Sequence, residues 1–194
     1  SVGITDSYMH DDATRILLAT IARIAAMHDK SMHPILSLFD GHHVRVTVLL
    51  KRSKEEASDW SENIGYRIRS SPYHFASQPE GEYSGPMWTG PIFDAEIAGR
   101  LTVERAIELC AGKPEDLPKE WNEIDIEHSQ REIERSVRHI SESAELLAQD
   151  HLLVALDSLG SAAGVGQIPS IKKIKSGLEK AGFRMARCHM PDVM

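Results

Sequence analysis

The chain has 194 residues, of which 41% are hydrophobic and 26% are charged, and its net charge is −7. A chain of this length can bury a sizeable core without help from a metal or a disulfide scaffold. Its two cysteines lie far apart, which favours a reducing compartment such as the cytoplasm. No apolar run approaches the roughly 20 residues of a membrane span, so no membrane partner is expected.

The N-terminal third predicts one helix followed by a β-hairpin. Asp11 or Asp12 can cap a helix that runs to about Asp29. Asp40-Gly41 separates two apolar runs, at 35–39 and 44–50, which is a strong hairpin signal. The predicted apolar face of the helix comprises Leu17, Ile21, Ile24 and His28. In the second strand, Val44, Val46, Val48 and Leu50 are predicted to face one way, and His43, Arg45 and Thr47 the other.

The middle of the chain predicts short elements joined by polar segments. Residues 51–62 read as a loop, 66–69 and 73–75 as short strands, and 78–91 as an ordered loop anchored by Trp88. Asp94 can cap a helix to about Cys110, where a structural buried thiol is expected. Gly112 and Pro114 would end that helix. An acidic linker is expected at 115–125.

Helices dominate the C-terminal third. Ser129 and Glu132 match a capping box. A shorter helix is expected at 151–159, a turn at 160–166, a final helix from Pro169 and Ser170 to Gly182, and a strand at 183–189. This order is that of a winged-helix unit. The predicted apolar stripes are Ile133, Val137, Ile140, Ala144 and Leu147 in the first helix, and Ile171, Ile174 and Leu178 in the last.

Charge is unevenly distributed, and a basic cluster stands out against the acidic chain. Only Glu179 opposes it, so the segment 171–187 carries about +5 and the remainder about −12. The cluster is either a solvated helix face or a phosphate-binding surface. Its members are Lys172, Lys173, Lys175, Lys180, Arg184 and Arg187.

Other familiar site patterns are missing from the sequence. Gly164-Val165-Gly166 has neither a preceding strand nor a third glycine opening a helix, so a dinucleotide site is not expected there. None of the ten histidines has the spacing of a zinc ligand pair, and no metal site is expected. The carboxylates between 115 and 150 read as solvated helix surface. No loop suited to a nucleotide or to S-adenosylmethionine is recognised.

Three ordered segments resemble the tRNA (guanine(26)-N2)-dimethyltransferase family. They are residues 14–23 continued to 40–46, residues 85–94 (GPMWTGPIFD), and residues 178–189 (LEKAGFRMARCH). The second segment is the most specific. Its motif residues, which we expect to be structural, are Gly85, Pro86, Trp88, Gly90 and Pro91.

The resemblance implies a larger parent enzyme that methylates guanine N2 in tRNA with S-adenosylmethionine as donor. By the same comparison, residues 1–55 correspond to the tail of the catalytic domain, and 56–194 to a C-terminal tRNA-binding domain. The implied fold is α+β: a helix and a β-hairpin from the end of a Rossmann-like methyltransferase sheet, then a small mixed α/β domain with a winged-helix-like C-terminal unit. The donor-binding and catalytic residues are expected upstream, so this chain alone should be inactive, with no catalytic residue of its own.

The sequence also departs from the family. Many relatives carry paired cysteines between the hairpin and residues 85–94, whereas Ser70, Ser71 and their neighbours here offer none, so no zinc ribbon is expected. Ala186-Arg187-Cys188-His189 replaces a segment that carries serine and threonine in relatives, which leaves a side-chain role for those two residues in doubt.

The sequence therefore predicts a tRNA-binding module, with the missing methyltransferase domain as its partner. The basic cluster would contact phosphates, which fixes register rather than base choice. Self-association through the unpaired N-terminal hairpin is also expected. A winged-helix DNA-binding regulator and a structural or oligomerisation module remain alternatives. Weaker tRNA-binding candidates are Arg45, Lys51, Arg52 and Arg67.

Overall fold

The computed structural model describes residues 3–39, 42–70, 74–110, 122–149, 153–156, 164 and 168–188. Two small antiparallel sheets and several helices make a mixed α and β fold. The elements, in chain order, are α1 (Met9–Ala26), β1 (Lys30–Phe39), β2 (Val44–Arg52), α2 (Lys54–Ser58), the 3-10 helix η1 (Asp59–Asn63), β3 (Ile64–Ile68), β4 (His74–Ala76), β5 (Tyr83–Trp88), α3 (Ala95–Gly99), α4 (Val103–Cys110), α5 (Glu123–Leu147) and α7 (Ile171–Lys180).

Helix α1 is confirmed, but its cap and its buried face differ from the prediction. It begins after Tyr8, which makes no side-chain cap, and Asp11 and Asp12 lie inside the first turn as buried residues. Neither carboxylate caps the helix, because Arg15 pairs with Asp11 and Arg67 pairs with Asp12. Ile24, predicted to face inward, is 50% exposed, and His28 is exposed. The buried positions include Leu18, Ala19, Ala22 and Ala25.

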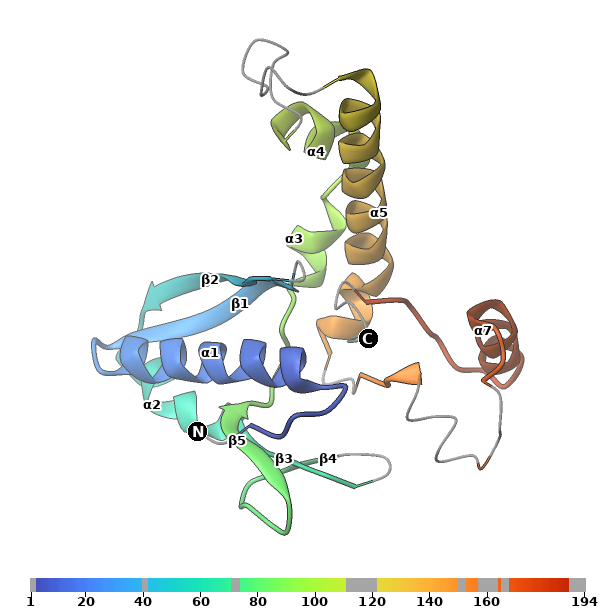
Figure 1. The fold of residues 1–194 in the computed structure, drawn as a ribbon. Helices are drawn as coiled ribbons and strands as arrows, with labels where there is room; N and C mark the ends of the chain where they lie inside the picture. The colour runs from blue at the N-terminus through green and yellow to red at the C-terminus, as the bar shows by residue number, and fades with distance from the viewer. Residues whose placement is uncertain are drawn as a thin grey trace.

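Strands β1 and β2 pair antiparallel, with a register shift between Pro34 and Leu36. The strand β1 begins at Lys30, earlier than the apolar run suggested, because the pairing extends from Lys30 opposite Arg52 to Phe39 opposite Val44. Along β2 the alternation is confirmed from residue 44 to 48, whereas Leu50 is 45% exposed. Figure 1 shows the pair lying along one side of α1.

The second sheet has the order β4-β3-β5 and lies on the other side of α1 (Figure 1). Strand β5 corrects the prediction of a loop at 78–91: its glycine and proline obscured an extended segment that pairs with β3. The predicted loop at 51–62 is also wrong. Ser53 caps α2 by accepting from the Glu56 backbone N–H, and η1 follows directly.

Helices α3, α4 and α5 form an arm that projects from the sheets (Figure 1). Asp94 caps α3 as predicted, but the single predicted helix is two helices. The predicted capping box is wrong, because α5 begins earlier, with Asn122 and Asp125 as its reciprocal cap. Ser129 is therefore an interior position of the helix. The predicted stripe on α5 is confirmed at Val137, Ile140, Ala144 and Leu147, which are buried.

The C-terminal unit is confirmed only for its helix. Helix α7 begins after Ser170 and is followed by Gly182 at φ 84°, as predicted. Residues 183–188 form no strand, and Phe183 is 63% exposed, so the winged-helix arrangement is not confirmed. In the described chain, no helix is long and apolar enough to cross a membrane.

Several predictions fall outside the described residues. They are the turn at Asp40-Gly41, Ser71, Tyr73, the side chain of Cys110, the stops at Gly112 and Pro114, most of the linker predicted at 115–125, most of the helix at 151–159, the loop around Gly164, and His189. The end of the predicted linker is a correction, because residues 123–125 belong to α5.

One hydrophobic core joins both sheets to the arm. It contains Leu18 and Ala22 of α1, Met32 of β1, Trp88 of β5, and Ile140 of α5. Backbone hydrogen bonds reinforce this contact, because Ile92 and Phe93 both donate to the carbonyl oxygen of Leu147. The N-terminal hairpin and the segments after it therefore share a core.

Candidate functional site

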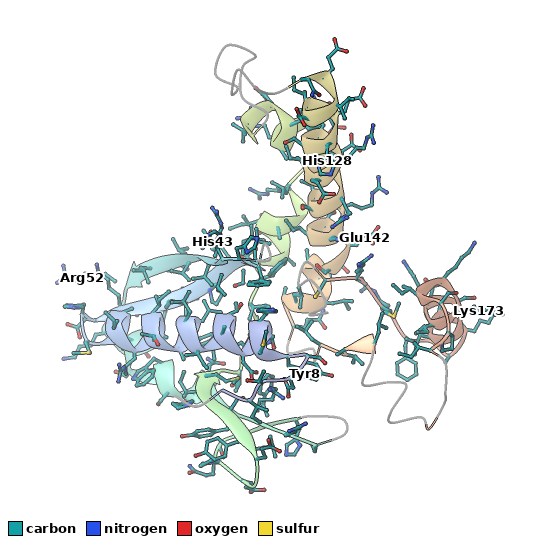
Figure 2. The ribbon with its side chains drawn as sticks, in the orientation of Figure 1. Tyr8, His43, Arg52, His128, Glu142 and Lys173 are labelled. Carbon is teal, nitrogen blue, oxygen red and sulfur yellow. The ribbon has the colours of Figure 1, made fainter. Side chains whose placement is uncertain are left out.

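The basic helix α7 exposes its cationic face to solvent. Its lysines are exposed, while Ile174 and Leu178 on the opposite side are half-buried. Ile171, predicted to point inward, is 40% exposed. Figure 1 shows α7 beside the body of the molecule, and Figure 2 shows Lys173 on it. The exposed lysines of the helix are Lys172, Lys173, Lys175 and Lys180.

The two arginines after α7 extend this cationic surface, and one of them already has an anionic partner. Arg184 donates to the carboxylate of Glu145 on α5, in an ion pair whose side chains are both more than half exposed. Arg187 is exposed. An exposed ion pair is weak, about 0–1 kcal/mol, so a phosphate could replace Glu145 at low cost.

The hairpin cations lie on β2, apart from α7. Arg45, Lys51 and Arg52 are all exposed. Figure 2 shows His43 and Arg52 toward opposite ends of the hairpin. The structure therefore does not gather the hairpin candidates and the basic helix into one compact site.

Arg67 is a correction to the predicted phosphate contacts. Its side chain is 1% exposed and lies between two carboxylates. Its Nε and Nη2 atoms donate to Asp12 at 2.7 and 2.6 Å, and its Nη1 and Nη2 atoms donate to Asp6, each at 3.1 Å. A phosphate cannot reach a guanidinium that is buried and fully engaged in this way, so Arg67 has a structural role.

The charge of Arg67 is fixed by this network. Burial alone would lower its pKa, but the hydrogen bonds and negative charge of Asp12, together with those of Asp6, outweigh burial and raise the pKa above its usual value. Asp11, one position earlier, behaves differently. Burial raises the pKa of the Asp11 carboxyl, although the neighbouring Arg15 opposes this shift.

Arg15 explains the motif at residues 85–91. Its Nη1 atom donates to the carbonyl oxygens of Trp88 and Gly90, both at 3.1 Å, while its Nε atom donates to Asp11. The indole N–H of Trp88 donates to the Pro91 carbonyl at 2.8 Å. The motif therefore closes the end of β5 against α1.

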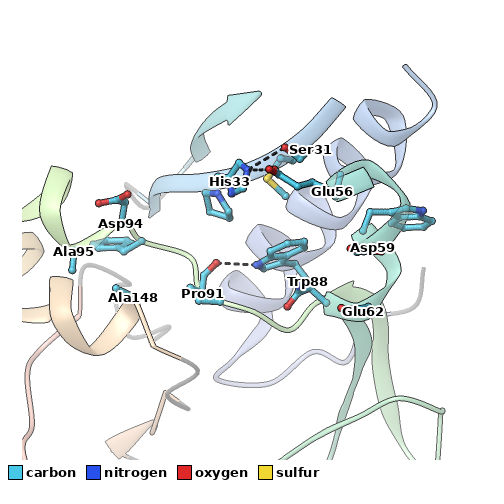
Figure 3. A pocket seen from close by; sticks show the side chains of 16 residues that line it. Ser31, His33, Glu56, Asp59, Glu62, Trp88, Pro91, Asp94, Ala95 and Ala148 are labelled. Carbon is cyan, nitrogen blue, oxygen red and sulfur yellow. Dashed lines mark hydrogen bonds and ion pairs between the residues drawn. The ribbon is translucent and has the colours of Figure 1, made fainter. Parts of the chain in front are cut away.

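A cavity of about 600 Å³ lies beside this motif (Figure 3). At its edge, Ser31 and Glu56 approach the same ring nitrogen, Nε2 of His33, at 3.1 and 3.2 Å. A catalytic triad needs the carboxylate on the other ring nitrogen, where it can orient the imidazole toward the nucleophile. The three residues therefore form a hydrogen-bonded cluster without the geometry of an acyl-transfer site.

Sequence reasoning missed the buried arginine–aspartate network and the cavity. One signal was available, because Asp11 and Arg15 have the i, i+4 spacing of a helical ion pair. The pairing of Arg67 with Asp12 spans 55 positions and left no local signal. In the described residues, no group of three or more histidine, cysteine, aspartate or glutamate side chains could hold a metal ion.

Comparison with known proteins points to one family. A family model described as N2,N2-dimethylguanosine tRNA methyltransferase matches residues 1–193. A tRNA (guanine(26)-N(2))-dimethyltransferase from Pyrobaculum neutrophilum is 37% identical over 88 residues, which are 45% of this chain and 25% of that relative. Its counterpart from Methanosphaera stadtmanae is 33% identical over 126 residues, which are 57% of this chain and 32% of that relative.

A solved structure shares the fold. It is Trm1 from Pyrococcus horikoshii in complex with S-adenosyl-L-methionine, which matches with a TM-score of 0.75 at 22% sequence identity. The match covers 98% of this chain and 47% of the Trm1 chain. The chain thus spans about half the length of that structure, and its matches cover 25% and 32% of the two relatives named above.

Proposed function

The chain belongs to the N2,N2-dimethylguanosine tRNA methyltransferase family. From this premise we propose that it is the tRNA-binding C-terminal part of a tRNA (guanine(26)-N2)-dimethyltransferase. In this proposal the parent enzyme transfers methyl groups from S-adenosylmethionine to a guanine N2 atom in cytoplasmic tRNA. Residues 1–55 would be the tail of the catalytic domain and 56–194 the tRNA-binding domain, and the two parts would pack on the shared core described above.

The donor is assigned to the part of the parent that lies outside this chain. The described residues do not fit a donor site, because both sheets are antiparallel and no described strand leads through a glycine-rich loop into a helix. Titration calorimetry with S-adenosylmethionine is expected to show no binding tighter than about 1 mM, an association free energy of about −4 kcal/mol. Tighter binding by this chain would contradict the assignment.

The observation that carries the tRNA proposal is the exposed cationic face of α7. In a chain of net charge −7, this helix concentrates lysines on its solvent side and has only one acidic residue, Glu179. Phosphate contacts by lysine and arginine release counterions from the nucleic acid, and this release provides most of the sequence-independent affinity. The hairpin residues Arg45, Lys51 and Arg52 are proposed as secondary contacts.

The test is the tRNA affinity of the full-length parent carrying Lys172→Glu and Lys173→Glu, measured across a salt series. Binding should weaken, and the slope of log affinity against log salt should fall by about one unit for each lost contact. A matched control is Arg105→Glu with Arg131→Glu, two exposed cations on the arm, away from both α7 and the hairpin. Equal affinities and parallel slopes for α7 and control variants would reduce α7 to a solvated helix face.

Two further measurements accompany this test: one separates the proposal from a DNA-binding regulator, and the other is a stability control. Duplex DNA should bind more weakly than tRNA; the reverse order would favour a DNA-binding regulator. Because the α7 lysines are exposed, their reversal should leave the free energy of unfolding unchanged within about 0.5 kcal/mol. Stability and donor binding can therefore be checked independently of tRNA binding.

The hairpin is proposed as the edge along which residues 1–55 join the rest of the catalytic domain. Within the described residues it is a two-stranded sheet, and Leu49 and Leu50 are each 45% exposed on it. Unpaired strand edges tend to pair with another chain. Light scattering on this chain alone should therefore show self-association, and a monomer at high concentration would count against the proposal.

A further inference from the structure

The cavity in Figure 3 has no part in the proposed tRNA contacts, and apolar and polar side chains both line it. Pro34, Trp60, Trp88, Pro91 and Phe93 line it. Its volume of about 600 Å³ is within the range of small-molecule sites, roughly 300–1,000 Å³. A ligand with a hydrocarbon portion could bury that portion against these side chains.

Carboxylate side chains lie at two separate ends of this cavity. Figure 3 shows Asp94 at one end and Glu56, Asp59 and Glu62 at the other, with Trp88 and Pro91 between them. Neither lysine nor arginine occurs among the described residues that line the cavity. An anionic ligand such as a phosphate would find no lysine or arginine on this lining, although Lys51 is close enough to contribute to lowering the pKa of the Glu56 carboxyl.

The hydrogen-bonded cluster at one end keeps its negative charge. A hydrogen bond from Ser31, followed by contacts with His33, lowers the pKa of the Glu56 carboxyl. Because Ser31 is buried and His33 is packed beside it, the carboxylate is held at the edge of the cavity. At this end of the cavity, His33 orients the half-exposed Glu56 carboxylate.

We propose that this cavity binds a linear polyamine, with one ammonium group at Asp94, another at the Glu56 end, and the methylene chain over Trp88 and Pro91. Charge-assisted hydrogen bonds to the two carboxylate ends would fix the ligand. Contact of the methylenes with the apolar wall would add the hydrophobic contribution. An inorganic cation would gain nothing from that wall.

Spermidine binding to the chain is the first measurement, by calorimetry and by tryptophan fluorescence, since Trp60 and Trp88 line the cavity. Two smaller probes separate one-ended from two-ended binding: 1,4-diaminobutane should bind more tightly than butylamine. Magnesium chloride at equal charge concentration is the control for nonspecific attraction to an acidic protein, and it should not displace spermidine at comparable concentrations.

Two variants test the two ends separately. Glu56→Gln and Asp94→Asn should each weaken spermidine binding by about tenfold or more, as expected for the loss of one charge-assisted contact. Asparagine also caps helices, so Asp94→Asn retains an acceptor for the Ile97 N–H and should keep α3 intact. Glu55→Gln is the matched control, because Glu55 is the exposed neighbour of Glu56 and does not line the cavity.

The proposal is overturned by any of three results. Spermidine could fail to bind at millimolar concentration, butylamine could bind as tightly as 1,4-diaminobutane, or Glu55→Gln could weaken binding as much as Glu56→Gln. These results do not depend on tRNA binding, so the proposals of a polyamine site and of tRNA binding can be disproved independently.

Discussion

Two sets of cationic side chains in this chain have opposite surroundings. In the body, Arg15 and Arg67 are buried, at 3% and 1% exposure, and both donate to aspartates. On α7, Lys172 and Lys173 are exposed. Positive charge therefore stabilises the fold in one region and is accessible to a binding partner in the other. The type of residue alone does not distinguish these two roles.

Removing a buried cation should have the largest effect on the free energy of unfolding. Arg67→Met should lower the free energy of unfolding by about 3–5 kcal/mol, because it leaves the Asp12 carboxylate buried without its partner. Urea denaturation measures the change. A loss below about 1 kcal/mol would mean that Asp12 finds another partner or water.

Arg69→Met is the control for that experiment. Arg69 lies two positions along the chain and pairs with Glu82, but both side chains are more than half exposed. Exposed pairs contribute about 0–1 kcal/mol, so this substitution should have little effect on stability. The contrast between the two arginines isolates burial from charge.

Glycines of the two regions provide a smaller test of the same contrast. Gly85 in β5 has φ 136°, and a Cβ added there would lie 3.0 Å from the Gly65 carbonyl oxygen. Gly85→Ala should therefore lower the free energy of unfolding by about 1–3 kcal/mol.

Gly177 in α7 has open space around its Cα, so Gly177→Ala should stabilise the helix by about 0.5–1 kcal/mol. Urea denaturation of the two variants measures both effects, and equal losses from both substitutions would contradict the difference between the regions.

Local patterns predicted local features well. The hairpin strands, the cap at Asp94 and the start of α7 each depend on a few neighbouring residues, and the structure has them. The apolar stripe of α5 was also predictable, because apolar residues at helical spacing indicate which face of a helix is buried. Three segments in the right order, including the one that contains Trp88, together indicated the family.

Features that depend on distant partners could not be read in this way. Asp12 resembles a helix cap by sequence, yet Arg67 engages it from 55 positions away. Strand β5 was hidden because Gly85 and Pro86 are typical of turns, and only pairing with β3 makes the segment extended. The cavity was invisible for the same reason, since β1, η1 and α3 contribute to it from separate parts of the chain.

The smallest expected effect concerns Glu56, whose half-exposed side chain lies between the two extremes of the comparison. Hydrogen bonding by Ser31, then by His33, lowers its pKa from 4.5. A carboxyl group with a lowered folded pKa binds fewer protons in the folded state than in the unfolded state. Its stabilising contribution is therefore present above pH 4.5 and is lost as pH falls through the folded pKa. Glu56→Gln should be slightly less stable than the natural chain at neutral pH and equal to it in acid, as measured by urea denaturation across pH. A stability difference that does not change with pH would show that the variant perturbs packing and that the Glu56 carboxylate contributes no charge-dependent stabilisation.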